Sequence, residues 1–244
     1  MRFSLKVGAL IYFGFLSVGS VFADGAPADN SSPGVSAPTP PEPTSAVWQT
    51  RRAHTAQLLR DAKAGDIQSR SAVDAVLTQF ESSPLKFTPL ENLDILGAYY
   101  VPREGVEKAL SIIVMNQVLG WYDALRFGTE SGRAEIVQNE GFFKRPFIIA
   151  GADSIKQMTA LMKEHPDQVK DAVQQGIDFA TKSKDSHPYD SHWPEAYGLE
   201  RIACAQGGKC VSPPVLPQDQ WQVAWQLSKQ RVLAYYVPTS SQSQ

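Results

Sequence analysis

"EGVEKALSIIVMNQVLGWYDALRFG", residues 104–128, is the stretch that decides the fold. Apolar residues cover most of its circumference from Ala109 to Leu119, and such a helix is either buried on all sides or crosses a membrane. Lys108, Asn116 and Asp123 interrupt the stretch too often for a span of about 20 apolar residues. The sequence therefore predicts the central helix of a bundle, in which buried polar side chains need hydrogen-bond partners.

The sequence on both sides of this stretch repeats mainly at helical spacing, and strand-like alternation is scarce. We therefore predict an all-α fold, a single bundle of about seven to nine helices. A degenerate array of helical hairpins is the alternative, because the hairpins would follow one another in series. The other expected helices cover residues 45–64, 66–83, 88–102, 129–140, 153–164, 166–182, 194–205 and 218–236.

Local signals fix some helix boundaries and oppose a helix at one place. In "TPLE", Thr88 can be the N-cap, Pro89 suits the first turn, and Glu91 can complete a capping box. A third helix starting there should end near Pro102, because the residue before a proline avoids helical dihedral angles. Proline also interrupts "GFFKRPFIIAG", residues 141–151, so we expect an ordered loop there, with a short strand as the alternative.

Residues 1–23 have the anatomy of a secretory signal peptide. Arg2 and Lys6 flank the start of an apolar core, and Val21 and Ala23 form an A-x-A-like cleavage site. The alternative is an uncleaved anchor helix. Both interpretations place the rest of the chain outside the cytoplasm, so the predicted localisation is periplasmic or secreted, with no stable membrane insertion after signal cleavage.

The mature chain should consist of a tether, one domain and a short tail. Residues 24–45 hold six of the seventeen prolines and no aromatic residue, a composition that favours disorder. Residues 46–238 are long enough for a single α-helical domain, and residues 239–244 should be a disordered tail. The formal charge of −2 is evenly distributed, which argues against a nucleic-acid partner because no basic face is visible.

Both cysteines and two of the four histidines lie within "HPYDSHWPEAYGLERIACAQGGKC", residues 187–210. In an exported protein, Cys204 and Cys210 should form a disulfide, and the glycines between them allow the chain to reverse. The short loop gives a stabilisation of about 2 kcal/mol. The alternative is a zinc site with His187, His192, Cys204 and Cys210 as its four ligands. We favour the disulfide, because oxidising conditions oppose free thiolates and the ligand spacing is irregular, and we expect no metal or other cofactor.

The stretch "DSHWPEAYG" allows two interpretations. His187, His192, Trp193 and Tyr197 could form a binding surface, with His192 as a proton carrier and the aromatic rings as contacts. The structural interpretation, which we favour, makes Trp193 a hydrophobic staple before a helix that starts at Pro194.

Candidate catalytic groups are few. The sequence contains no G-x-S-x-G, H-E-x-x-H, Walker or dinucleotide-binding motif. A cell-envelope hydrolase would have to combine Glu130 or Glu135 with His187 or His192 across a cleft between helices.

The sequence thus favours an exported binding module over an enzyme, so we assign no catalytic residue. The leading hypothesis is a module that binds or inhibits another exported protein, as an immunity-type or envelope accessory protein would. The alternatives are the envelope hydrolase and a small-ligand binding protein. A deep, apolar cavity would favour the small ligand.

Overall fold

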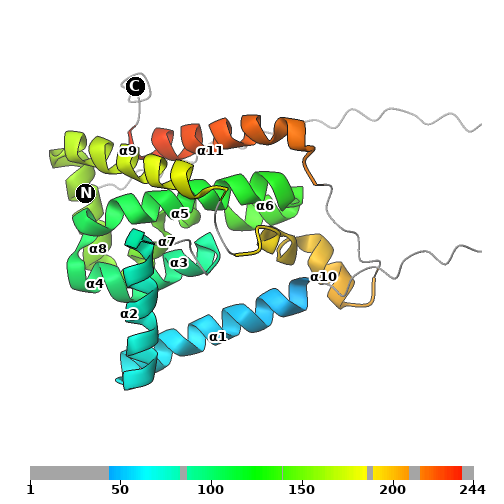
Figure 1. The fold of residues 1–244 in the computed structure, drawn as a ribbon, viewed down its shortest axis with the longest axis horizontal. Helices are drawn as coiled ribbons and strands as arrows, with labels where there is room; N and C mark the ends of the chain where they lie inside the picture. Colours follow the sequence, from blue (N-terminus) through cyan, green and yellow to red (C-terminus); the bar gives the residue numbers. More distant parts are fainter. Residues whose placement is uncertain (1–43, 83–86, 139, 186–188, 209–214, 238–244) are drawn as a thin grey trace, which may run out of the picture. The chain divides into compact units, whose positions relative to one another are not determined.

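Helix α5 (Val106–Phe127) lies at the centre of the computed structural model. Every residue from Ala109 to Ala124 is buried, which confirms the prediction of a helix buried on all sides. Helices α9 (Pro166–Ser183) and α11 (Trp221–Tyr236) contact both α5 and each other. Figure 1 shows these two helices along one side of α5, and α3 (Pro89–Ile95) on the other.

The structure describes residues 44–82, 87–138, 140–185, 189–208 and 215–237, all within one compact unit, Pro41–Gln244. No strand occurs among them, so the predicted all-α class is confirmed. The remaining elements are α1 (Thr44–Ala64), α2 (Ile67–Ser82), the π-helical turn η1 (Leu96–Tyr100), α4 (Val101–Glu104), α6 (Glu130–Ile136), α7 (Glu140–Ala150), α8 (Ala152–Glu164), η2 (Trp193–Ala196), α10 (Leu199–Ala205) and η3 (Gln218–Gln220).

The contacts of α5 describe a bundle and not a hairpin array. Helices far from α5 in sequence pack on it, whereas in an array each repeat contacts only its neighbours. No helix in the described ranges combines the length and apolar character that crossing a membrane requires.

The two buried amide side chains of α5 form hydrogen bonds with other helices. Asn116 accepts a hydrogen bond from Nδ2 of Asn92 on α3 (2.9 Å). Gln117 donates to the carbonyl oxygen of Phe143 on α7 (3.0 Å) and accepts from the hydroxyl of Tyr236 on α11 (2.9 Å). These bonds join α5 to three other helices and fix their positions along it.

A glycine allows α9 to approach α5 closely. A Cβ at Gly176 would lie 2.5 Å from the carbonyl oxygen of Ser111 and 2.6 Å from Cβ of Val114. No larger residue fits at this crossing without moving one helix away from the other.

The capping box at the start of α3 is confirmed. The Thr88 side chain accepts from the backbone N–H of Glu91, and the Glu91 carboxylate accepts from the Thr88 N–H (2.8 Å). The same carboxylate accepts from the hydroxyl of Thr55 on α1 (3.2 Å), so the cap also holds α1 against the bundle.

The expected end of this helix near Pro102 is wrong. The chain stays helical through Pro102 to Glu104, because the π-helical turn η1 precedes the proline and the N–H of Val101 bonds to the carbonyl of Leu96. The extra residue in this turn changes the hydrogen-bond register just before the proline, which has no N–H to donate. Gly105, with φ of 88°, then ends the helix.

The expected loop at 141–151 is also wrong, because these residues form α7 with Pro146 inside it. A proline inside a helix costs about 3 kcal/mol. Packing offsets this cost: Phe142, Phe143 and Phe147 are buried, and Pro146 itself lies against η1. A Cβ at Gly97 of η1 would meet the Pro146 carbonyl oxygen at 2.5 Å, so this glycine permits the contact.

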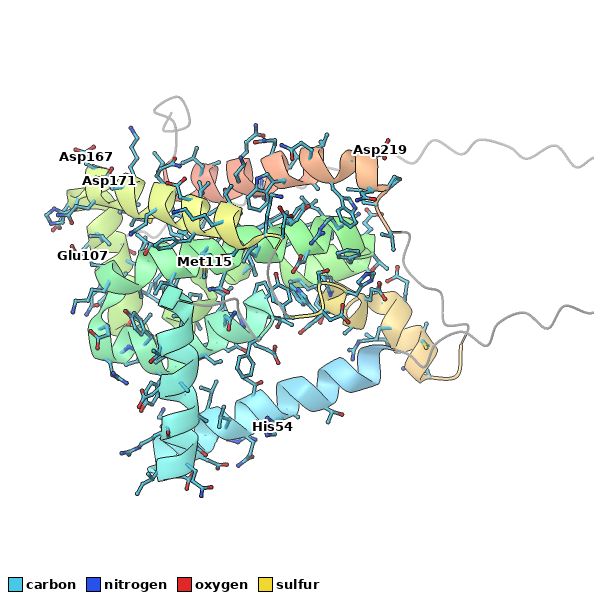
Figure 2. The ribbon with its side chains drawn as sticks, in the orientation of Figure 1. His54, Glu107, Met115, Asp167, Asp171 and Asp219 are labelled. Atoms are coloured by element: carbon cyan, nitrogen blue, oxygen red, sulfur yellow. The ribbon has the colours of Figure 1, made fainter. Side chains whose placement is uncertain are left out.

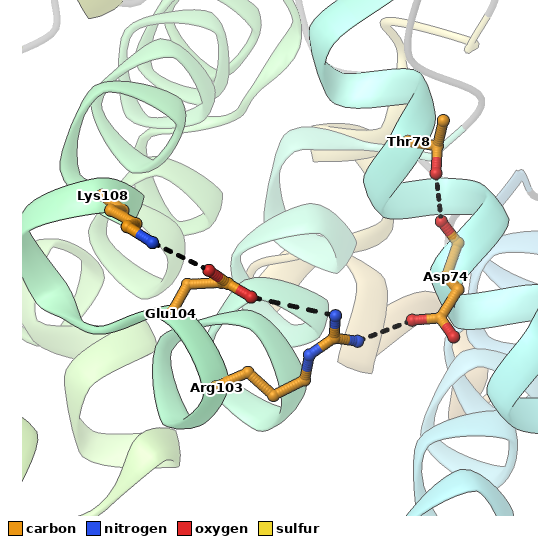
Figure 3. Close-up of polar contacts among 5 residues, drawn as sticks. All are labelled: Asp74, Thr78, Arg103, Glu104 and Lys108. Carbon is orange, nitrogen blue, oxygen red and sulfur yellow. Dashed lines mark hydrogen bonds and ion pairs between the residues drawn. The ribbon is translucent and has the colours of Figure 1, made fainter.

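Exposed ion pairs join α4 to α2 and to α5. Arg103 binds Asp74 of α2 (2.7 Å), and Glu104 binds Lys108 of α5 (3.2 Å) (Figure 3). The Thr78 hydroxyl donates to the Asp74 carbonyl oxygen within α2. Exposed pairs of this kind contribute little to stability.

Candidate functional site

The segment that follows α9 is anchored on α5 by a buried charged cluster. Trp193 is 1% exposed, and its indole N–H donates to the carboxylate of Asp123 (2.9 Å). The other oxygen of Asp123 accepts from Arg126 (2.7 Å), and the Arg126 guanidinium lies 3.8 Å from the centre of the Tyr122 ring. Trp193 therefore belongs to the core and offers no contact area to a partner.

The same cluster holds two further parts of the chain. Tyr189 is buried beside Asp123, and burial, followed by the negative charge of Asp123, raises the pKa of Tyr189 well above its ordinary value. The carbonyl oxygen of Arg126 accepts from the N–H of Leu216 (2.9 Å), which leads into η3 and α11. The chemistry of this cluster is therefore that of a structural anchor.

His192 lies at the surface. Its ring stacks on Phe127, with ring centres 4.0 Å apart, and its Nδ1 lies 2.6 Å from a carboxylate oxygen of Glu195. The side chain of His192 is 44% exposed. The histidine is therefore accessible, but its carboxylate partner is neither Glu130 nor Glu135.

Neither of the two carboxylates proposed for catalysis forms a hydrogen bond or ion pair with a histidine of the described residues. Glu130 is exposed at the start of α6. Glu135 accepts from the N–H of Gly198 (2.9 Å) and thereby caps α10. His187 lies outside the described residues, so its part in this hypothesis stays untested.

Helices α6 and α10 are joined by hydrogen bonds at their first turns. The hydroxyl of Ser131 accepts from the N–H of Leu199 (2.8 Å) and donates to Glu200, and this hydrogen bond holds the pKa of the Glu200 carboxyl below its usual range. Gly198, with φ of 107°, separates η2 from α10, so the single helix expected over 194–205 is wrong. Only glycine adopts this dihedral angle without strain.

The predicted disulfide and the zinc alternative both involve residues outside the described ranges. Cys204 lies in α10, but Cys210 and His187 are not described, so the disulfide stays a prediction. Of the other histidines, His54 lies on the exposed face of α1 (Figure 2) and His165 is exposed between α8 and α9. The described residues contain no group of three or more side chains able to hold a metal.

A half-open cavity of about 460 Å³ lies elsewhere, between α7, α8 and the last turn of α11. Phe147, Met158 and Tyr236 are almost fully buried and form its inner wall, while Ile155 is partly exposed. The cavity is lined by Lys144, Phe147, Ile155, Met158, Thr159, Met162, Lys163, Pro166, Tyr235, Tyr236 and Val237. Its size and apolar wall are typical of a small-ligand site.

The polar groups of this cavity are cationic or neutral. Lys144, on α7, forms an exposed ion pair with Glu140. Burial raises the pKa of Tyr235, so its phenol remains a neutral hydroxyl at neutral pH. The Tyr236 hydroxyl is already donated to Gln117, so Tyr236 serves as apolar wall.

A second cavity of about 420 Å³ contains two residues that the sequence singled out. Tyr197 and Glu135 line it together with Arg145, whose guanidinium pairs with Asp94. Its charged groups are therefore already paired or hydrogen-bonded within the protein, and His192 does not line it.

Of the residues that line the first cavity, sequence reasoning named only the pair Tyr235–Tyr236. A second signal, not used there, is the pair Met158 and Met162, four residues apart on α8, since methionines one turn apart share a helix face. From sequence, Tyr235 and Tyr236 could line a ligand pocket, but paired aromatics next to helix ends are more often part of the core and its rim.

Comparison with protein-family models, with curated proteins and with solved structures finds no match to this chain.

Proposed function

We propose that this chain is an exported binding protein that holds a small, largely apolar ligand in the cavity between α7, α8 and α11. The observation that carries the proposal is the cavity itself, at about 460 Å³ and walled by Phe147, Met158 and Tyr236. Export is supported by the signal-peptide pattern of residues 1–23. The sequence left open a protein partner, a hydrolase or a small ligand, and an apolar cavity is the feature that favours the small ligand.

The cavity provides the driving force that such a ligand needs. Apolar surface removed from water stabilises a complex by about 25 cal/mol per Å². Met158 and Met162 are flexible and polarisable, so they can adjust to ligands of different shape. No charged pair has to be broken in the inner wall, because Phe147 and Met158 carry no polar side-chain atoms that require partners.

The proposal can be tested with the neutral apolar dye N-phenyl-1-naphthylamine, whose fluorescence rises in an apolar site. We expect the purified protein to bind it, and Met162→Asp to weaken binding at least tenfold, because a carboxylate would enter the half-buried wall. The matched control is Gln157→Asp, exposed on the same helix and outside the lining. Equal binding by both variants, or none by the wild type, would contradict the proposal.

One observation favours a second candidate, a protein partner. On α11, Val223 and Leu227 are 59% and 49% exposed and lie one turn apart. A partner of the immunity or accessory type could cover this face. If so, an exported protein should co-purify with the wild type. The variant Leu227→Asp should lose this partner, and the control Gln226→Asp should retain it. Loss in both variants, or retention in both, would contradict binding at this face.

A further inference from the structure

We propose that the ligand of the α7–α8–α11 cavity is a single-chain amphipathic anion of the fatty-acid type, with its alkyl chain against Phe147 and Met158 and its carboxylate between Lys144 and Lys163. The inference rests on the proposed function and adds to it the sign of charge on the ligand.

The charged residues of the lining decide this sign. Lys144 and Lys163 are the two charged side chains among the lining residues described, and no carboxylate accompanies them. They come from different helices, α7 and α8, so they can approach one head group from two directions. Both lysines would repel a cationic head group, and a neutral hydroxyl would gain less from them than a carboxylate does.

Both lysines can exchange their present surroundings for a ligand. Within the described contacts Lys163 forms no ion pair or hydrogen bond, and the residue is exposed. Lys144 pairs with Glu140, but both side chains are exposed, at 47% and 74%, so water already competes for this pair. A carboxylate bound at Lys144 would replace Glu140 at little cost.

A neutral donor accompanies the two cations. Tyr235 is half-buried in the lining and lies close enough to Lys144 for the two groups to influence each other's ionisation. Its hydroxyl can donate a hydrogen bond to a carboxylate. Because the apolar wall lies behind these groups, an alkyl chain and a head group can be accommodated at the same time.

The test compares ligands that share one alkyl chain and differ in the head group. Isothermal titration calorimetry of the full protein would use decanoate, 1-decanol and decyltrimethylammonium below their micellar concentrations, with acetate as the head group alone. We expect decanoate to bind roughly fivefold or more tightly than decanol, and acetate and the cation to bind weakly or not at all.

Variants connect the preference to the two lysines. The double variant Lys144→Gln with Lys163→Gln should weaken decanoate binding roughly fivefold and leave decanol binding unchanged. The matched control is Lys156→Gln, an exposed lysine of α8 that pairs with Asp153 and does not line the cavity. This control should bind decanoate as the wild type does.

The outcomes separate the two proposals. Binding of decanol or the cation with an affinity equal to or above that of decanoate would overturn the charge inference and leave the apolar site intact. Absence of binding by every decyl compound would overturn the proposed function as well. A decanoate preference that survives the double variant would show that the lysines do not create it, and would also overturn the inference.

Discussion

Asp123 shows how burial changes the contribution of an ion pair to stability. It is fully buried, and its two oxygens accept from Arg126 and Trp193. Burial of the Arg126 guanidinium has a desolvation cost, and the Asp123 carboxylate is the one negative charge described beside it that offsets this cost. The exposed pair of Arg103 with Asp74 has no such cost, because both groups remain about half-exposed (Figure 3).

We therefore expect Asp123→Ala to lower the free energy of unfolding by about 3–5 kcal/mol, because it leaves Arg126 buried without its partner. Urea unfolding followed by circular dichroism measures the change. The comparison variant, Asp74→Ala, should cost at most about 1 kcal/mol. Similar losses for the two variants would mean that the Asp123 cluster does not anchor the 189–197 segment.

Two buried tyrosines make stability depend on alkaline pH. Burial is the main cause that raises the pKa of both Tyr189 and Tyr236. In the unfolded chain each tyrosine loses its hydroxyl proton near pH 10. In the folded protein the two buried tyrosines keep this proton. Above pH of about 10 the folded state therefore binds more protons than the unfolded state.

The two tyrosines make their full contribution to the free energy of unfolding below pH of about 10. Above it, this free energy falls by about 1.4 kcal/mol per pH unit for each tyrosine. We expect phenolate absorbance of the buried tyrosines to rise together with the loss of helical circular dichroism. Full ionisation of all tyrosines near pH 10 in a protein that is still helical would contradict the burial of Tyr189 and Tyr236.

At the scale of elements, the helices were predictable wherever local signals and packing agree. The Thr88 capping box and the apolar circumference of α5 are read directly from sequence, and the structure confirms both. Pro102 and Pro146 were misleading, because a local change of helix type at Pro102 and a tertiary contact at Pro146 keep the chain helical. A π-helical turn precedes Pro102, and the close contact with Gly97 supports α7 at Pro146. Neither effect is visible in a local pattern.

The crossing of α9 over α5 gives a test at this scale. Gly176→Ala should raise intrinsic helix propensity by about 1 kcal/mol. The new Cβ would nevertheless meet the Ser111 carbonyl oxygen at 2.5 Å, so we expect a net loss of about 1–3 kcal/mol in the free energy of unfolding. Gln175→Ala, exposed on the same helix, serves as the control, and a stabilised Gly176→Ala protein would contradict this close crossing.

At the scale of the whole molecule, the sequence predicted the all-α class, and the binding residues that it singled out lie in a different region from the cavity on which the proposed function rests. The segment 189–200 gathers the conspicuous residue types, and in the structure Trp193 and Tyr189 serve the core. The cavity is built from α7, α8 and α11, which are separated in sequence, and α7 was itself expected to be a loop. A site formed by three distant elements has no local signature.

Export and the disulfide can be checked by intact mass. The protein recovered from the producing cells should lack residues 1–23 and should gain the mass of two hydrogens on reduction, as a Cys204–Cys210 bridge requires. Two free thiols before reduction, or one zinc ion per chain, would contradict the disulfide. An N-terminus that retains Met1 would contradict signal cleavage.

The central claim, that the cavity holds a ligand, is tested most directly by NMR of the methionine methyl groups. Met158 and Met162 line the cavity, whereas Met115 is buried in α5 and does not (Figure 2). On titration of methyl-labelled protein with decanoate, we predict saturable shifts for Met158 and Met162 and an unchanged Met115 signal. If the cavity signals stay fixed while decanoate binds, or if Met115 alone responds, the ligand site lies elsewhere and the account is wrong.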